Sequence, residues 1–397
     1  MFFPIDAEEW SQALGRIRRL RHSRNWSRIG SSELYWNAPF LAVLIDTIDG
    51  LLIEDPRLAL ELSRQAILLA ERIRPEDCPG SSELGKRSLG AWAHAVHGSS
   101  CRALERYPDA EASFQTALAL TGRKVLHWAA AEVWRRYAAL LLFQQSPAGL
   151  DFVNKAVDYY AGFPVGQADA LILRGLFRQY LANDLTGAAL DTGRALELLD
   201  AKRSPREARS WAIAVDNLGI IYASGTTDLE AIEATLKRLR HAAAKLSRHE
   251  PFRRMTCMWV QALLLAPLGV GRKAARLLVK ASDWLLHNGH YKAAAICSAD
   301  LARILFRSGD ENAAIAVLDD LPDATGEAEP RFQAYLAEQL ANWRAKKLGE
   351  ESLAALREAL ALYDRNPLKA DQPLGTSDGR SSSPGPPKAA LDSPLSS

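Results

Sequence analysis

Apolar residues recur at steps of three and four along most of the chain. Leu58, Leu62, Ala66, Leu69 and Ile73 form one such series. This spacing places the apolar side chains on one face of a helix. Alternating runs of β-branched residues and Asn-Gly hairpin turns, which are typical of strands, do not recur. The pattern therefore predicts an all-α fold.

Residues that end helices separate these series. Pro75, Gly122, Gly162, Pro251 and Gly309 are examples. The segments between them predict helices of about 12 to 18 residues with short connections. From Pro367 onward the chain is rich in Ser, Pro and Gly and has no apolar series. Such a segment buries too little surface to offset its ordering entropy, so we expect residues 365–397 to be a disordered tail.

Internal repetition is the most informative signal in the sequence. In three segments a small residue in a first helix precedes a small residue in a second helix by 12 positions. These pairs are Gly98 and Ala110, Gly219 and Ala231, and Ala302 and Ala314. Small residues allow two antiparallel helices to approach closely, while neighbouring aromatic and leucine side chains fill the space beside them. Each helix pair covers the apolar face of the pair before it.

Residues around these positions resemble the tetratricopeptide-repeat pattern of W-x2-L-G-x2-Y followed by A-x3-F. One copy reads Leu218-Gly219-x2-Tyr222, and another has Ala110-x3-Phe114. Weaker copies extend the series to Ala110, Gly149, Ala188, Ala231, Ala274, Ala314 and Ser352, at steps of 39, 39, 43, 43, 40 and 38 residues. The family period is about 34 residues and that of HEAT-type repeats about 40–47, so longer helices or connections are expected here.

The resemblance implies an α-solenoid of about eight antiparallel helix pairs over residues 32–364, wound as a right-handed superhelix. The chain is also similar to bacterial cytoplasmic repeat proteins and to the repeat half of peptide-sensing regulators. A protein or peptide partner would bind the concave face. First-helix positions of the family's inner face correspond to Trp134, Trp259, Arg303 and Arg307, and Arg102, Tyr180 and Phe306 lie one residue from that register.

Each of these side chains has a second interpretation, which is packing between neighbouring helices. For Trp134 and Trp259 packing is favoured. The three arginines are harder to bury, and we expect them to be exposed or paired. Arg and aromatic residues dominate the energetics of protein interfaces, which is the reason for considering the set as a partner-binding surface.

Residues 1–31 predict a basic capping helix. Its arginines are Arg16, Arg18, Arg19, Arg21, Arg24 and Arg28. Trp26 lies among them, and no acidic residue occurs between Trp10 and Ser32. Clustered arginines beside an aromatic residue can contact nucleic acid or another anionic surface. The favoured alternative is the solvated outer face that a terminal repeat requires, with Trp10, Leu14, Ile17 and Leu20 on the buried face.

Composition adds little to the functional argument. The formal net charge is +2, which does not indicate a nucleic-acid or membrane-surface role. Four cysteines without metal-binding spacing are typical of reduced thiols. The first residues lack the basic start and long apolar run of a secretory signal, and no apolar run approaches the roughly 18 residues of a spanning helix. We expect a cytoplasmic protein with no membrane partner.

No phosphate-binding loop, nucleophile elbow or HExxH motif occurs. His94, His97 and Cys101 share one helical face and are usable zinc ligands, but they flank Gly98 and so should face the core. We expect neither metal nor cofactor and no enzymatic activity. The sequence favours a scaffold or adaptor that binds a peptide or partner segment. The alternative is a peptide-sensing or nucleic-acid-contacting transcriptional regulator that uses the Arg-rich N-terminus.

Overall fold

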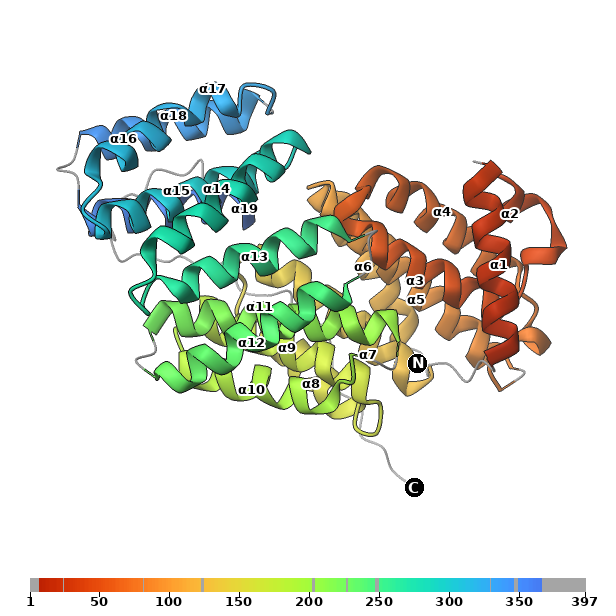
Figure 1. The fold of residues 1–397 in the computed structure, drawn as a ribbon. Coiled ribbons are helices and arrows are strands. Elements are labelled where there is room, and N and C mark those ends of the chain that lie inside the picture. The colour runs from red at the N-terminus through yellow and green to blue at the C-terminus, as the bar shows by residue number, and fades with distance from the viewer. Residues whose placement is uncertain are drawn as a thin grey trace, which may run out of the picture.

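The computed structural model describes residues 7–23, 25–80, 82–122, 125–201, 204–225, 228–246, 250–328, 330–345 and 349–365. Within these ranges the chain forms 19 α-helices and two short 3-10 helices, with no strand (Figure 1). The prediction of an all-α fold is therefore confirmed. The predicted tail lies outside the described residues from position 366 on.

Helices α3 to α16 follow one another as seven first-and-second helix pairs. The first helices are α3 (Ala38–Glu54), α5 (Glu83–Ala103), α7 (His127–Phe143), α9 (Pro164–Tyr180), α11 (Pro205–Gly225), α13 (Pro251–Leu265) and α15 (Tyr291–Arg307). The second helices are α4 (Pro56–Arg72), α6 (Tyr107–Thr121), α8 (Gly149–Tyr159), α10 (Leu185–Leu198), α12 (Leu229–Lys245), α14 (Gly271–His287) and α16 (Glu311–Asp319). Each second helix packs on its own first helix, and α4 to α14 also pack on the next first helix.

Shorter elements and the two terminal helices complete the array. They are α1 (Ala7–Ser23), α2 (Arg28–Ser31), η1 (Glu33–Tyr35), η2 (Pro75–Asp77), α17 (Leu321–Ala324), α18 (Pro330–Arg344) and α19 (Glu350–Arg365). At the N-terminal end α1 packs on α3 and α2 on α4. At the other end α19 packs on α15, and α18 contacts α19 and α17.

In several pairs, the turn between the first and the second helix contains one residue with a left-handed backbone conformation, that is, a positive φ. In five pairs this residue is Glu105, Gln145, Asn183, Gly269 or Gly309. It lies four or five positions before the small second-helix residue, which is Ala110, Gly149, Ala188, Ala274 or Ala314 respectively. The turn reverses the chain over a few residues. The repeat period found in the sequence thus coincides with a recurring backbone conformation in the turns between paired helices.

Close packing explains the small residues at the repeat positions. A Cβ atom added to Gly98 would lie 2.8 Å from the ring of Phe114 in the second helix of the same pair. One added to Gly219 would lie 2.3 Å from Val260 in the next first helix. Helices α5 and α11 have 21 residues each, longer than the predicted range.

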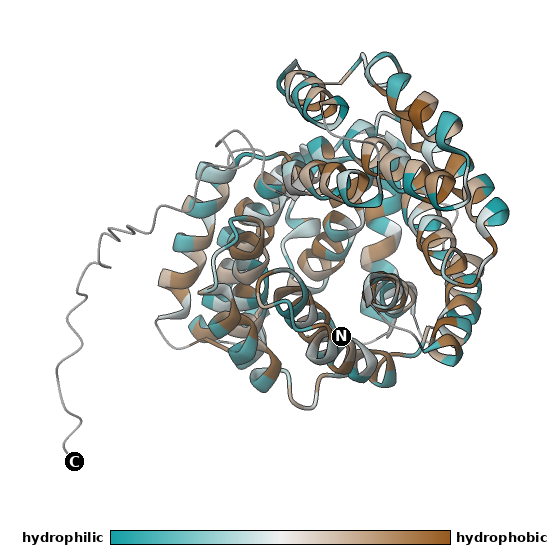
Figure 2. Ribbon diagram, turned by 90° about the vertical axis from the view of Figure 1, so that its left-hand side faces the viewer, coloured by the Kyte–Doolittle hydropathy of each residue, from teal (hydrophilic) through white to brown (hydrophobic). Residues whose placement is uncertain are grey.

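The apolar core continues through the array in overlapping clusters. The largest involves helices from α1 to α11, a second spans α10 to α16, and a third joins α15 to α19. Hydrophobic and hydrophilic residues share the helices, as expected for amphipathic segments that pack on both neighbours (Figure 2). No helix of the described ranges has both the length and the apolar character needed to cross a membrane.

Candidate functional site

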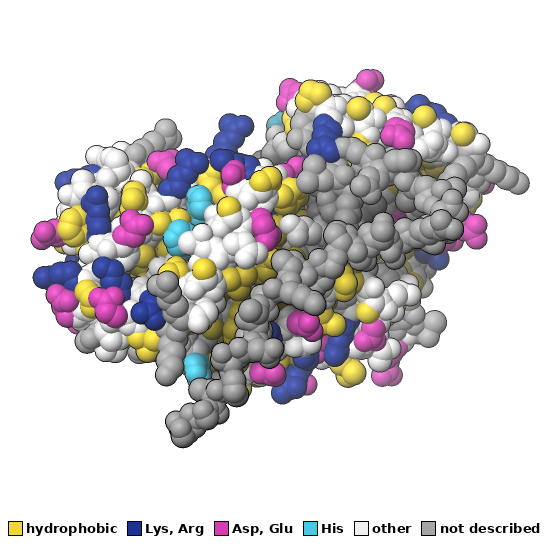
Figure 3. Space-filling model, turned by 180° about the vertical axis from the view of Figure 1, so that it is seen from behind, with side chains coloured by type: hydrophobic (Ala, Val, Ile, Leu, Met, Phe, Trp, Pro, Cys, Tyr) yellow, Lys and Arg dark blue, Asp and Glu magenta, His cyan; other side chains and the backbone are white. Residues whose placement is uncertain are grey.

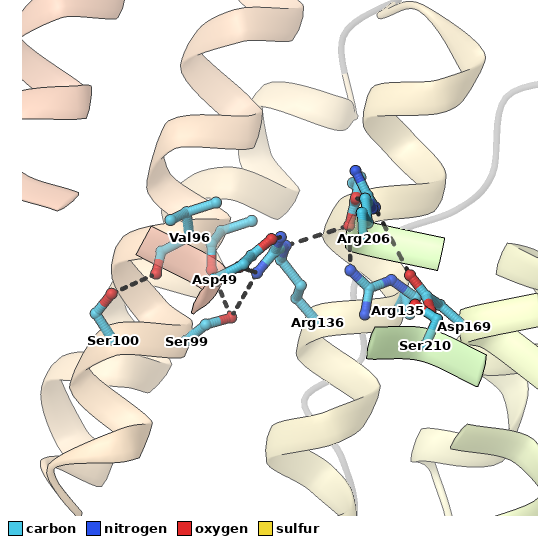
Figure 4. Close-up of polar contacts among 11 residues, drawn as sticks. Asp49, Val96, Ser99, Ser100, Arg135, Arg136, Asp169, Arg206 and Ser210 are labelled. Atoms are coloured by element: carbon cyan, nitrogen blue, oxygen red, sulfur yellow. Dashed lines mark hydrogen bonds and ion pairs between the residues drawn. The ribbon is translucent and has the colours of Figure 1, made fainter. Parts of the chain in front are cut away.

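Charged side chains from four first helices meet inside the array, and a serine from a fifth first helix joins them. We call this group the interior charged cluster, and it comprises Asp49 (α3), Ser99 (α5), Glu132, Arg135 and Arg136 (α7), Asp169 (α9), and Arg206 and Ser210 (α11) (Figure 4). Its contacts join α3 to α7 and α7 to α11, although neither pair of helices is adjacent in the chain order of first helices. Such contacts require the array to curve, with the first helices on the inner side.

Arg136 is the central cation of the cluster. Its Nη1 and Nη2 atoms donate to the two carboxylate oxygens of Asp49 at 2.9 and 2.7 Å, and its Nε atom donates to Glu132 Oε2 at 3.2 Å. Ser99 Oγ accepts a longer contact of 3.4 Å from Nη1. The side chain is 4% exposed. Paired, hydrogen-bonded geometry of this kind is what allows a guanidinium to be buried.

Glu132 is fully buried, and its carboxylate forms ion pairs with three arginines. Arg135 Nη2 donates to its Oε2 atom at 2.7 Å, and Arg206 Nη2 lies 3.7 Å from its Oε1 atom. Burial alone would raise the pKa of the Glu132 carboxyl, but the charges of Arg135, Arg136 and Arg206 outweigh it and lower the pKa to about 2. Glu132 is therefore a negatively charged carboxylate at neutral pH, and its charge offsets the positive charge of the surrounding arginines.

The cluster continues toward α13. Asp169 accepts from Ser210 Oγ at 2.6 Å and lies 3.6 Å from Arg206. One turn further along α11, Arg209 Nε donates to Glu250 Oε1 at 2.6 Å. A Cβ atom on Gly50 of α3 would lie 3.3 Å from Arg209 Nη2. The first helix pair therefore meets the fifth and sixth across the inner side of the array.

Arg102, on α5, forms no ion pair with an acidic side chain of the described residues. Its guanidinium carbon lies 4.6 Å from the ring centroid of Phe143, and its Nε atom is inaccessible to solvent and lacks a hydrogen-bond partner among the described residues. Burial lowers the pKa of Arg102 to about 10, with Arg135 and Arg136 acting in the same direction. The side chain as a whole keeps partial exposure.

The remaining predicted arginines find their partners within the chain. Arg303 and Arg307 of α15 lie 3.8 and 3.3 Å from Glu350 at the start of α19. On the same helix Asp300 accepts from the indole Nε1 of Trp259 at 2.9 Å and from Arg357 Nε of α19 at 3.2 Å. Helix α19 thus occupies the surface of α15 on which the sequence suggested an external partner.

The predicted aromatic residues mostly pack between helices. Trp134 meets Tyr159 of α8 edge to face at a centroid distance of 4.8 Å. Phe306 is partly buried in the cluster that joins α15 to α19. Tyr180, at the end of α9, is 38% exposed. Packing, the second interpretation from the sequence, thus describes Trp134 and Phe306.

The N-terminal arginines lie mainly on the outer surface. Arg18, Arg19, Arg21 and Arg28 are exposed, whereas Arg16 donates to the carbonyl oxygen of Leu34 at 2.8 Å. Arg24 lies outside the described residues. Trp26 is 6% exposed and belongs to the core, so it cannot stack on a base. The predicted buried face is present, with Ile17 and Leu20 buried and Trp10 and Leu14 packed against them.

The His94, His97 and Cys101 set is used for packing. His97 Nδ1 shares a hydrogen bond of 2.9 Å with Ser63 Oγ, and its Nε2 atom lies 3.7 Å from the buried Cys101 thiol. Burial lowers the pKa of His97 to about 4. Across the described ranges no group of three or more His, Cys, Asp or Glu side chains could hold a metal ion.

The surface pockets on the described part of the molecule include the following two. One, of about 720 Å³, is formed by α10 and the end of α11, with Leu190 and Tyr222 in its lining. The other, of about 400 Å³, lies where α3, the α5–α6 turn, α13 and the start of α15 meet, and includes Glu105, Phe252 and Lys292. Acidic and basic side chains are interspersed on the described surface seen in Figure 3.

Sequence reasoning missed the residues that make the interior charged cluster. A signal was present in α7, where Glu132, Arg135 and Arg136 interrupt an otherwise apolar segment that reads from Trp128 to Phe143. Charged residues among core positions indicate a buried ion-pair network, because isolated charges are too costly to bury. Their partners on α3, α9 and α11 come from distant parts of the chain and follow no sequence spacing.

No protein-family model matches the chain, and no curated protein matches it. The residues and the geometry therefore carry the functional argument.

Proposed function

We propose that this chain is a tetratricopeptide-like solenoid that acts as a cytoplasmic binding scaffold or adaptor, without catalytic activity. The recurring turn, the small residues at the helix contacts and the succession of pairs support a right-handed superhelix of about eight pairs. Here α18 and α19 would be the eighth pair, docked differently from the others. Solenoids of this class use a curved inner surface to hold an extended partner.

The observation that supports the inner side most directly is the charge at Arg102. Every cation of the interior charged cluster has an acidic partner within 4 Å, while Arg102 has none among the described residues. A partly accessible guanidinium next to an aromatic ring suits the recognition of a protein segment. The partner-binding surface would therefore lie around Arg102 and Phe143 rather than over α15, where α19 already packs.

Site-specific photo-cross-linking tests this proposal. A photoreactive phenylalanine analogue at Phe143 is expected to capture a defined partner from lysate, and one at Leu190, which is 69% exposed on α10, is the outer-surface control. Capture at Phe143 should disappear in an Arg102→Met background and persist in Arg106→Met, whose guanidinium instead pairs with Asp109 at 2.6 Å. Capture only at position 190 would move the binding surface to the outer face and contradict the proposal.

A second candidate function has one observation in its favour. Arg18, Arg19 and Arg21 are exposed on the last turns of α1, where no ion pair to a described residue engages them. A regulator that contacts nucleic acid would bind duplex DNA with an affinity that falls steeply with salt. Replacing these three arginines by Glu tests this function better than removing α1 does. Removal of α1 would also take away Ala13, Ile17 and Leu20, which α1 buries against α3. Anisotropy of a labelled duplex that is unchanged by the triple variant would exclude this function.

A further inference from the structure

The smaller of the two pockets is built from both ends of the array, and we call it the junction pocket. Its lining comes from the end of α3, the α5–α6 turn, the start of α13, the start of α15 and the start of α18. Glu105 of the turn forms an ion pair with Lys292 of α15 within this lining. Because these segments lie far apart in the chain, the pocket exists only while the two ends of the array are in contact.

The walls of the junction pocket are mainly apolar and aromatic. Phe332 is fully buried, Phe252 is half-buried, and Ile53 is 40% exposed. The volume of about 400 Å³ lies near the lower end of the range of small-molecule sites, which is about 300–1,000 Å³. The pocket therefore fits a compact molecule of one or two rings and not an extended peptide.

His290 is a polar group of the lining with unused hydrogen-bonding capacity. Its imidazole stacks on Trp284 at a centroid distance of 5.6 Å and an interplanar angle of 20°, and it meets the Phe252 ring at 4.6 Å. Within the described ranges no hydrogen bond reaches either ring nitrogen. Burial lowers the pKa of His290, so the ring is uncharged at neutral pH and offers one N–H donor and one nitrogen acceptor.

The charges of the lining cancel each other. Glu105 and Lys292 neutralise one another, and Lys292 also lies 5.3 Å from the ring centroid of Tyr363. A charged ligand would lose its hydration here without meeting an unpaired opposite charge. An uncharged aromatic ring avoids this cost and gains stacked or edge-to-face contacts with the phenylalanine rings. A nitrogen or N–H group on such a ring would pair with His290.

We propose that the junction pocket binds a small, uncharged heteroaromatic molecule, which packs against Phe252 and hydrogen-bonds to His290. Since the bound molecule contacts segments from both ends of the chain, it binds the closed array and stabilises closure by mass action. The junction pocket is thus a site through which a small molecule controls whether the ends of the array stay together. This site goes beyond the scaffold function proposed above and does not depend on it.

The first test titrates 5-fluoroindole into the full chain and follows its fluorine resonance. We expect saturable binding with a dissociation constant of about 1 mM or below, and competition by indole. Indole-3-acetate and tryptamine carry a charge, and cyclohexanol lacks an aromatic ring, so each should compete roughly tenfold more weakly than indole. Charged analogues that compete as well as indole, or an absence of saturable binding at about 1 mM, would overturn the proposal.

Variants locate the bound probe. His290→Phe keeps a ring against Trp284 but removes both nitrogens, so it should weaken binding roughly tenfold. Ile53→Trp adds bulk to the lining at a partly exposed position and should also weaken binding. Leu190→Trp is the matched control, because Leu190 is 69% exposed and lines the other pocket. Binding that is lost in Leu190→Trp but retained in His290→Phe would place the probe between α10 and α11 and contradict the assignment.

Amide exchange of the wild-type chain tests the coupling without any variant. Bound indole should slow exchange in residues 101–107 and 289–295 together, because the closed array holds both segments against the ligand. Residues 185–197, which line the other pocket, should exchange at unchanged rates. Slowing in only one of the two junction segments, in neither of them, or in residues 185–197 would show that the ligand does not join the ends of the array.

Discussion

Arg136 shows how one residue can hold three elements of the array together. Its fork binds both oxygens of Asp49 on α3, and it also reaches Glu132 and Ser99. Replacement by Met would leave two carboxylates with less compensation in a largely buried setting. Breaking a buried pair from one side typically destabilises by about 3–5 kcal/mol.

We therefore expect Arg136→Met to reduce the free energy of unfolding by about 3 kcal/mol or more, measured by urea denaturation followed by circular dichroism. Arg106→Met is the matched control, because its ion pair with Asp109 is largely exposed. Such exposed pairs contribute about 0–1 kcal/mol. Equal losses in the two variants would show that the interior pairing is not a source of stability.

The buried carboxyl group of Asp216 should make the stability of the protein depend on pH. It is 8% exposed on α11, Thr256 Oγ1 donates to its Oδ2 atom at 3.0 Å, and burial raises its pKa from 3.8 to about 7. Between these values the folded chain binds this proton more tightly than the unfolded chain does. Stability from this group is therefore greatest below about pH 4 and declines as pH rises to about 7.

Asp216→Asn should remove that decline and raise the free energy of unfolding at pH 8, by on the order of 3 kcal/mol. The measurement is a series of urea titrations from pH 4 to pH 8. Glu233→Gln, at an exposed position on α12, gives the reference for a simple change in net charge. A wild-type slope that survives in Asp216→Asn would assign the pH dependence to other groups.

At the scale of elements, the turns between paired helices carry a measurable strain. Gln145 adopts a φ of 53° between α7 and α8, where Gly269 and Gly309 stand in later pairs. A left-handed conformation costs a residue with a Cβ atom about 1–2 kcal/mol, whereas glycine adopts it freely. A change to glycine would therefore gain stability in the folded state. Part of that stability is lost because glycine makes the unfolded chain more flexible.

Gln145→Gly is accordingly expected to stabilise the protein by about 0.5–1 kcal/mol, measured as a rise in the urea midpoint. Gln144→Gly is the adjacent control, because Gln144 has a φ of −76° and gains nothing from glycine. That control should destabilise by about 0.5–1 kcal/mol. Two variants that change stability in the same direction would argue against strain at position 145.

Local sequence patterns predicted the helices themselves, but they did not predict how the helices assemble at the C-terminal end. The spacing of apolar residues predicted the helices, and Gly98 and Gly219 marked close helix contacts because only a missing Cβ permits them. The docking of α19 on α15 depends on Glu350 meeting Arg303 and Arg307, side chains far apart in the sequence. No periodicity encodes such a meeting, so the sequence could not distinguish an external partner from the chain's own last helix.

At the scale of the whole molecule, the array closes on itself. In an ideal solenoid each repeat contacts only its neighbours, and distant repeats unfold independently. Here Glu105, in the turn after α5, forms an ion pair with Lys292 at the start of α15, which also lies 5.3 Å from the Tyr363 ring centroid of α19. Together with the meeting of Gly50 and Arg209, this contact joins the N-terminal pairs to the C-terminal ones.

Closure should therefore couple the stability of distant segments. Lys292→Glu places two like charges at the contact between the α5–α6 turn and α15. We expect faster amide exchange in both segments, residues 101–107 and 289–295, together with a larger radius of gyration by small-angle scattering. Since the pair is partly exposed, with side chains 20% and 35% exposed, its direct contribution is modest, about 1 kcal/mol or less.

The charge-swapped variant Glu105→Lys/Lys292→Glu separates closure from local disruption. It restores the ion pair with reversed polarity, so amide exchange in both segments should return toward the wild-type rates. Lys280→Glu on the neighbouring α14 is the control for charge reversal at an exposed position. If the swap behaves like Lys292→Glu alone, the ion pair does not hold the two ends together. If only residues 289–295 respond to Lys292→Glu, the ends are stable independently and the molecule behaves as an open solenoid, because a closed array must transmit the change to the α5–α6 turn.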